Sequence, residues 1–321
     1  MPRFQDRVLS VRVLGPVVAA LILGSVALAQ TWTGAPAPSP ELQAAMTKAD
    51  AGDPKPLTAM ADAGNADAQY YAGAMYIFGR GTIAKDPVRG CAYEQKASAS
   101  RADATHLLAQ CYQTGSGGAQ DRVKAEAAYT RAAAMGFPKS KCALGQMLMT
   151  EPAQAARGLA LCQEAAKAGD ADAQSAVGDA YFNGAGANRD HGQARKWYDM
   201  AAKQNDLDAM RRLGVMYATG DGGKKDTKKA LQLWMAGEKA GDPLAPILVA
   251  DQLFSNMTGG RKPGPGQYKF KGGVPTGDIG VIEDWYKEAA KVDPRPDVKT
   301  RADYALKILV SLKTAANVSV R

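Results

Sequence analysis

Few residues of this 321-residue chain have types and spacing that could support catalysis. The chain contains only two histidines, His106 and His191, and neither belongs to a partner motif that would orient it for acid–base chemistry. The motifs of zinc proteases, nucleophile elbows and phosphate loops are absent, and so is the Ser-x-x-Lys pattern. The sequence therefore predicts no catalytic residue, no cofactor and no enzyme activity.

The four cysteines form two pairs of equal spacing. Cys91 and Cys111 are 20 residues apart, and so are Cys142 and Cys162. No Cys-x₂-Cys spacing occurs, so we expect no metal site. The midpoint of each pair falls in an expected turn between antiparallel helices, where equidistant residues face each other. In an oxidising compartment this predicts the disulfides Cys91–Cys111 and Cys142–Cys162, each adding on the order of 3 kcal/mol; in a reducing one, these would be buried free thiols.

A pattern of residues, the repeated phrase, recurs about every 36 residues and predicts the helices that position these side chains. Apolar or small residues follow each anchor at +4, +5 and +8, which keeps one helix face apolar. The +5 residue is always Gly or Ala, and Gly in a helix costs about 0.5–1 kcal/mol, so we expect a neighbouring helix to approach closely there. This period indicates a solenoid of helical hairpins. Its anchors are Ala68, Ala104, Ser140, Ala173, Ala209 and Ala245.

The second half of each repeat follows a Gly-rich turn, such as 184–186 or 220–223, which supplies a left-handed helix cap. It carries a bulky aromatic residue and then an Ala pair, which we expect to fill the space between helices. The aromatic residues are Trp197-Tyr198 and Trp285-Tyr286, with Tyr93, Tyr129 and Trp234 at the equivalent place.

At these positions the chain resembles the Sel1-like repeat family, a branch of the tetratricopeptide-like helical repeats. Residues 169–204 match the family pattern nearly in full, and the resemblance extends over 64–290, about six repeats. It implies an all-α, right-handed solenoid of antiparallel helix hairpins that binds partners without catalysis. Cysteine-rich secreted relatives close hairpins with disulfides, which supports the pairing above. Because some such relatives are described as penicillin-binding or β-lactamase-like, a cell-wall or β-lactam binding or hydrolysing protein is the alternative.

The ends of the chain indicate export and capping. Residues 1–29 resemble a signal peptide cleaved after Ala29, which would leave a periplasmic or secreted protein without a stable membrane span; the alternative is an uncleaved inner-membrane anchor. We expect a disordered spacer at 30–40, N-terminal capping helices at 41–63, and a C-terminal capping helix and tail at 291–321.

The net charge of +8 falls to about +6 without residues 1–29. Such an excess favours anionic surfaces, including cell-wall polymers. No basic stripe with interleaved aromatic residues is present, so we expect no nucleic-acid partner.

The resemblance implies that the first helix of each repeat lines a concave surface. The +2, +6 and +9 positions share one face of that helix. Their mixture of aromatic, amide and charged groups suits an extended peptide or a protein segment in the bacterial envelope, although a generic polar surface explains it equally well. The candidate groove residues are Tyr70, His106, Gln110, Gln146, Asp179, Phe182, Arg211 and Asp251.

An insertion at 257–280 breaks the period in the sixth repeat. Its candidate binding residues are Arg261, Tyr268 and Phe270, of which the last two alternate with lysines like a short strand that could extend a partner's sheet. The alternative is a tolerated flexible insertion.

We therefore expect deletion of 259–277 to leave the thermal unfolding midpoint unchanged, because an insertion between repeats contributes little to their packing. Circular dichroism would measure the midpoint, and a clear drop would show that the insertion is part of the core. Comparing partner capture by the deleted and full chains would then test its role in binding.

Overall fold

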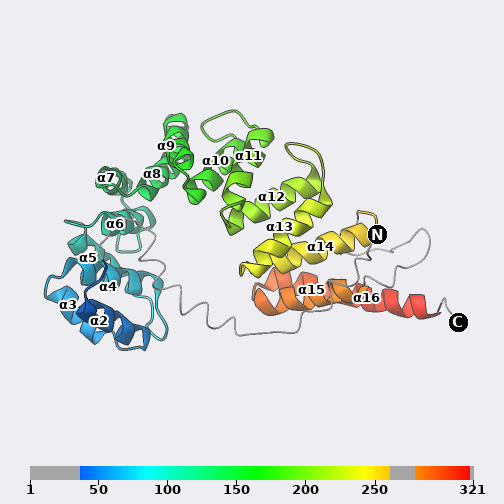
Figure 1. Cartoon of the computed structure of the whole chain (residues 1–321), viewed down its shortest axis with the longest axis horizontal. Coiled ribbons are helices and arrows are strands. Elements are labelled where there is room, and N and C mark those ends of the chain that lie inside the picture. The colour runs from blue at the N-terminus through cyan, green and yellow to red at the C-terminus, as the bar shows by residue number, and fades with distance from the viewer. Residues whose placement is uncertain (1–36, 261–278, 319–321) are drawn as a thin grey trace. The chain divides into compact units, whose positions relative to one another are not determined.

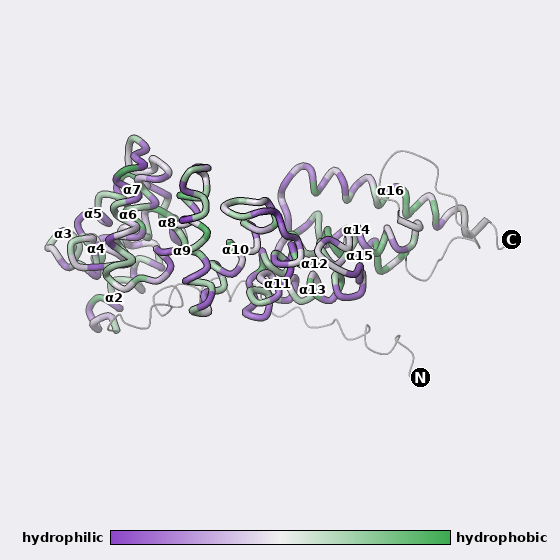
Figure 2. Tube along the Cα trace, turned by 90° about the horizontal axis from the view of Figure 1, so that it is seen from above, coloured by the Kyte–Doolittle hydropathy of each residue, from purple (hydrophilic) through white to green (hydrophobic). Residues whose placement is uncertain are grey.

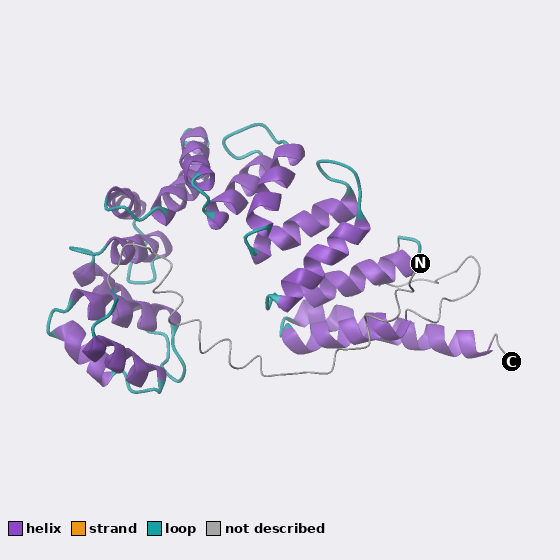
Figure 3. Ribbon diagram, in the orientation of Figure 1, coloured by secondary structure: helices purple, strands orange, loops and turns teal. Residues whose placement is uncertain are grey.

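A computed structural model describes residues 37–260 and 279–318, which form fifteen helices, α2 to α16, and no strand (Figures 1 and 3). The expected all-α solenoid of helical repeats is confirmed. The chain divides into two compact units, Met1–Phe137 and Pro138–Arg321.

In the first unit, consecutive helices pack as antiparallel neighbours, with α4 against α5 and α6 against α7 as hairpins. The residues expected to cap the N-terminus form α2 and α3, and their Leu42, Met46 and Leu57 are buried with Met75 and Tyr76 of α4. The helices are α2 (Pro40–Asp50), α3 (Lys55–Asp62), α4 (Ala66–Phe78), α5 (Pro87–Ala97), α6 (Ala102–Thr114) and α7 (Arg122–Ala134).

The second unit continues the same pattern and ends in a long helix, α16, which packs against α15. Val298, Ala302 and Leu309 of α16 are fully buried beside Ile282 and Tyr286. Polar and apolar residues interleave along its helices (Figure 2). These are α8 (Lys139–Met149), α9 (Ala155–Lys167), α10 (Ala171–Asn183), α11 (His191–Ala202), α12 (Leu207–Thr219), α13 (Thr227–Lys239), α14 (Ala245–Met257), α15 (Ile279–Val292) and α16 (Pro296–Val318).

Aspartates fix where the second helix of four hairpins begins. In each, the side chain accepts a hydrogen bond from the backbone N–H three residues on, which satisfies a donor that the helix itself cannot. The first helix of the repeat ends before the loop at a glycine; Gly184 and Gly220 adopt left-handed conformations there. The capping aspartates are Asp86, Asp121, Asp190 and Asp226.

The small +5 residues allow the close helix approach that the sequence predicts. A Cβ added to Gly178 would lie 2.7 Å from ring carbons of Tyr198, and one added to Gly214 would meet the indole Nε1 of Trp234 and lie 2.6 Å from its Cε2. Each aromatic ring therefore packs on bare backbone of the partner helix. At Gly178 and Gly214, a larger residue would push the two helices of the hairpin apart.

The shortened third repeat replaces the aromatic contact with a disulfide. Cys162 lies where an aromatic ring lies in other repeats, and a Cβ on Gly145 would come 2.9 Å from its sulfur. The predicted bond Cys142–Cys162 is confirmed, with a Cα–Cα distance of 4.1 Å between α8 and α9. Without a ring between them the backbones of α8 and α9 meet, Gly145 against Gly158. The bond therefore holds a tighter hairpin than the aromatic repeats form.

In the first repeat, the expectation that Tyr93 occupies the aromatic position is wrong. Glu94, not Tyr93, is the residue that faces Gly73 at the +5 contact. The loop from Gly79 to Asp86 is one residue longer than the loop from Gly115 to the next capping aspartate. The extra residue shifts the register, so the side chain after Tyr93 takes the aromatic place.

Gly178→Ala tests the close approach. We expect it to lower the free energy of unfolding by about 1–3 kcal/mol, because the overpacking strain against Tyr198 exceeds the helix propensity that Ala gains. Gly237→Ala in α13 is the matched control, since its Cβ would lie 3.6 Å from the nearest atom, an ordinary contact with Asp242. That change should leave the protein equally or slightly more stable in urea denaturation. Equal behaviour of both variants would contradict the packing account.

Candidate partner-binding surfaces

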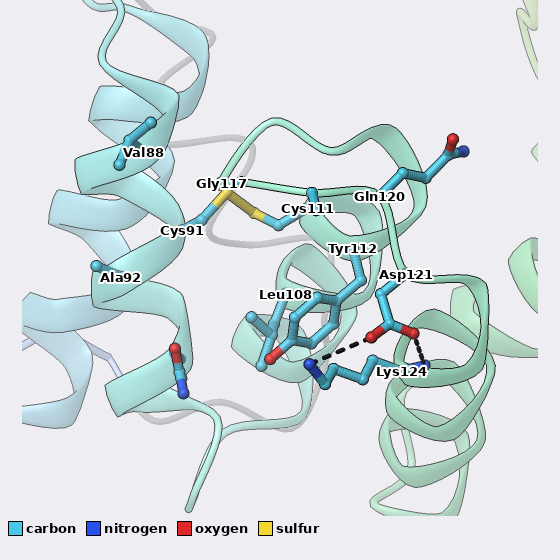
Figure 4. A pocket seen from close by; sticks show the side chains of 13 residues that line it. Val88, Cys91, Ala92, Leu108, Cys111, Tyr112, Gly117, Gln120, Asp121 and Lys124 are labelled. Atoms are coloured by element: carbon cyan, nitrogen blue, oxygen red, sulfur yellow. Dashed lines mark hydrogen bonds and ion pairs between the residues drawn. A yellow bond between two sulfur atoms is a disulfide. The ribbon is translucent and has the colours of Figure 1, made fainter.

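An open pocket of about 380 Å³ lies between α5, α6 and the loop 115–121 (Figure 4). Val88, Ala92 and Leu108 give it an apolar wall, while Gln95 and Gln120 give it polar lining. The Cys91–Cys111 disulfide belongs to the lining as well. This combination can hold an apolar side chain and meet polar groups beside it.

The predicted disulfide Cys91–Cys111 is confirmed and joins α5 to α6, the helices of consecutive repeats. The loop packs directly on the bond, because a Cβ on Gly117 would lie 2.6 Å from the Cβ of Cys91. The covalent link and the loop therefore fix the two helices that form the pocket wall.

An ion pair between Asp121 and Lys124 lies at the pocket rim. Asp121 caps α7 by accepting from the backbone N–H of Lys124 at 2.9 Å, and its carboxylate lies 3.2 Å from the Lys124 ammonium. That backbone hydrogen bond first, and then the Lys124 side chain, lower the pKa of Asp121. The ammonium also lies 5.6 Å from the ring centroid of Tyr112. The rim thus carries both charges, and the Lys124 ammonium lies near both the Asp121 carboxylate and the Tyr112 ring.

This pocket differs from the surface that the sequence predicts. Leu108 and Tyr112 lie about half a turn around α6 from His106 and Gln110, because each residue advances about 100°. Sequence reasoning missed Val88 and Lys124 because neither belongs to the repeated phrase, and it assigned Leu108, the +4 residue of the second repeat, to the apolar helix face. The cysteine spacing was the one available signal, since a bond between consecutive repeats holds α5 beside α6.

In the first unit, the predicted groove residues are half-buried and in contact with neighbours. The guanidinium of Arg101 lies 4.5 Å from the ring centroid of Tyr70. His106 meets Tyr129 edge to face at 5.3 Å, and its Nε2 lies 3.2 Å from the Gln110 amide nitrogen. Tyr70 on α4 and the His106–Gln110 pair on α6 therefore contact different residues, although α4 and α6 are both first helices of repeats. Their role in partner binding stays a prediction.

In the second unit, the predicted residues of α8 and α10 differ in exposure. Gln146 is exposed. Asp179 accepts a hydrogen bond from the Tyr198 hydroxyl, and burial of that hydroxyl followed by this bond raises the pKa of Tyr198. Phe182 stacks on the ring of His191 at 4.7 Å. Asp179 and Phe182 therefore tie α10 to α11, while Gln146 is open to solvent.

Arg211 and Asp251 also join helices. Arg211 Nη1 lies 3.1 Å from Oδ1 of Asp242, whose side chain is 1% exposed. Asp251 accepts from the Tyr286 hydroxyl at 2.9 Å and from Arg301 at 2.7 Å. Replacing either residue would leave a buried or half-buried partner unpaired, which costs stability. Gln146 is therefore the better probe of the first-helix face.

Several expectations fall outside the described residues: the signal peptide at 1–29 and the insertion residues Arg261, Tyr268 and Phe270. Within 37–260 and 279–318, no three His, Cys, Asp or Glu side chains gather as metal ligands would. No helix in those ranges combines the length and apolarity needed to cross a membrane.

Comparison with known proteins identifies the repeats. The family model described as Sel1 repeat matches five consecutive segments that together make up just over half of the chain. The sixth hairpin, α14–α15, lies outside them. A search of curated proteins finds no match. The matched segments are 66–100, 102–137, 138–170, 171–206 and 207–234.

Two solved structures are similar over most of the chain. A Sel1 repeat protein from Oxalobacter formigenes is 25% identical with a TM-score of 0.55, over 72% of this chain and 89% of that one. The protein c5321, a protective antigen present in uropathogenic Escherichia coli strains displaying an SLR fold, is 26% identical with a TM-score of 0.53. That match covers 74% of this chain and 48% of c5321, so the chain spans about half the length of c5321.

The disulfide at the pocket gives a direct test. We expect Cys91→Ala combined with Cys111→Ala to lower the free energy of unfolding by roughly 3 kcal/mol, because the bond closes a 20-residue separation in the unfolded chain. Urea denaturation followed by circular dichroism measures the change. An unchanged midpoint would show that helix packing alone holds α5 and α6 together.

Proposed function

Because the chain belongs to the Sel1 repeat family, whose fold commonly serves as a protein-interaction scaffold, we propose that it binds a protein or peptide in the bacterial cell envelope without catalysing a reaction. The pocket between α5, α6 and the loop 115–121 carries the proposal. Its volume lies at the lower end of the range for small-molecule sites, which suits one or two side chains of a partner.

The exposed part of the pocket wall supports a protein partner. Val88 of the pocket wall is 62% exposed, and Val123, which precedes the lining residue Lys124 but is not itself part of the lining, is 79% exposed. Apolar side chains beside a polar rim are common where a partner buries them. Lys124 and Gln120 at the rim can meet a partner's carboxylates and backbone groups.

The envelope location rests on covalent chemistry. Both cysteine pairs are bonded, and no described cysteine is free. Disulfides persist in oxidising compartments, so they are consistent with an extracytoplasmic protein. Together with the predicted signal peptide at 1–29, they favour the periplasm or secretion.

The first-helix face remains a second proposed surface for the same function. It includes exposed Gln146, and the half-buried His106 and Gln110. It differs from the pocket in location, so single substitutions can separate the two surfaces.

Val88→Arg should weaken partner capture about tenfold, a loss of roughly 1.4 kcal/mol, because a charged side chain would replace apolar contact at the pocket. Gln146→Arg is the matched variant on the first-helix face. Both sites are exposed, so both variants should keep the unfolding midpoint of the unmodified chain. Crosslinking in the native cell would identify the partner, and quantitative pull-down from envelope extract would measure its capture.

Loss of capture with Gln146→Arg alone would assign binding to the first-helix face, and unchanged capture with both would contradict the proposed surfaces. Turnover of nitrocefin or muropeptides by the purified chain would instead favour the cell-wall alternative and overturn a purely binding role.

A further inference from the structure

One buried side chain departs from the rule that the other aspartate-capped hairpins follow. Eight residues after the capping aspartate, the second helix of the other aspartate-capped hairpins carries a large aromatic side chain: Tyr129, Tyr198 or Trp234. In the first hairpin the same count from Asp86 reaches Glu94. An ionisable carboxyl group therefore occupies a core position built for a ring.

Glu94 is enclosed between α4 and α5. The residue is 0% exposed, and neither of its carboxyl oxygens has a hydrogen-bond partner. A Cβ placed on Gly73 would lie 2.6 Å from the Glu94 carboxyl carbon, so the group lies flat against the backbone of α4. A carboxylate buried in this way is costly unless it is paired or protonated.

The aromatic residues at this position also bury a polar group, but in each of them that group forms a hydrogen bond. Tyr129 donates to the Gln113 side chain at 2.7 Å, and the Trp234 indole N–H donates to a backbone oxygen at 3.2 Å. Tyr198 donates to a carboxylate on the first helix of its own hairpin. Glu94 has no such acceptor or donor.

The positive charge that favours ionisation of Glu94 is that of Arg101, whose guanidinium is already engaged by other groups. It donates to Asp103 of α6 at 2.9 Å, pairs with Asp67 of α4, and lies over the ring of Tyr70. Asp103 adds a like charge beside Glu94. Two carboxylates thus compete for the one guanidinium that could offset ionisation of a third.

The other charged groups on neighbouring elements point elsewhere. On α5 itself, Arg89 and Lys96 lie over the Tyr93 ring, at 5.8 and 5.3 Å from its centroid. From α3, Asp62 accepts from the Tyr93 hydroxyl at 2.9 Å. Burial raises the pKa of Glu94 well above its usual range, and the charge of Asp103 raises it further against the opposing effect of Arg101.

We propose that Glu94 is a pH-sensitive lock between α4 and α5: the protonated side chain keeps the first hairpin packed, and loss of its proton loosens that hairpin. The sign follows from linkage. A carboxyl that titrates higher in the folded than in the unfolded chain gives its full stability below pH 4.5, the ordinary value, and loses it as pH rises through the folded value.

Hydrogen exchange followed by mass spectrometry on the full chain tests the lock. After correction for intrinsic exchange rates, protection of peptides from α4 and α5 should fall with rising pH by up to tenfold per pH unit, the slope for one linked proton. In Glu94→Gln that slope should disappear, because the amide has the same shape and does not titrate. The control Glu164→Gln removes an exposed carboxyl of α9 and should leave the slope intact.

An identical pH dependence in the unmodified chain and in Glu94→Gln would overturn the proposal. A second measurement avoids reliance on the variant's folding. The ¹³C carboxyl resonance of Glu94 in the unmodified folded chain should titrate above the exposed glutamates, and titration alongside them would also overturn it.

Discussion

The contact that the other features depend on is the one between the backbone of each first helix and a single side chain of the second. A small residue at +5 removes the atoms that would hold the helices apart, and a flat ring fills the space that remains. Gly178 with Tyr198, and Gly214 with Trp234, are the cleanest cases. Because interiors tolerate little change in volume, this contact fixes both the spacing of a hairpin and the register of its two helices.

Two repeats satisfy the contact without a ring, and both are informative. The third repeat loses its loop glycines, brings α8 and α9 into backbone contact, and adds the Cys142–Cys162 bond at the same place. The first repeat keeps the spacing but inserts a carboxyl group. In the third repeat a covalent bond takes the place of the ring, and in the first repeat the packing depends on the proton of Glu94. Stability therefore responds to redox conditions in one repeat and to pH in the other.

The polar residues on the first helices could bind a partner, but several of them also hold the hairpins together. Asp179 and Asp251 accept hydrogen bonds from tyrosines of the second helices, and Arg211 pairs with buried Asp242. These contacts hold hairpins together, so polar residues on that face do not by themselves indicate partner binding. The pocket beside Cys91–Cys111 lies on the other side of α6, and its exposed apolar wall has no comparable structural use, which is why it supports the proposed binding role more directly.

The sequence by itself determined the repeat, the helical hairpins and both disulfides, because each follows from regular spacing along one chain: a fixed period, small residues at +5, and cysteines equidistant from a turn. It did not determine the pocket, which forms where α5 of one repeat, α6 of the next and the loop 115–121 meet. It also misassigned the residue that packs on Gly73 in the first repeat, since one extra loop residue places Glu94 there, while Tyr93 is buried elsewhere in the same core. Only tertiary structure decided those features, because burial and partner choice depend on which side chains meet across helices, and spacing along the chain does not encode that.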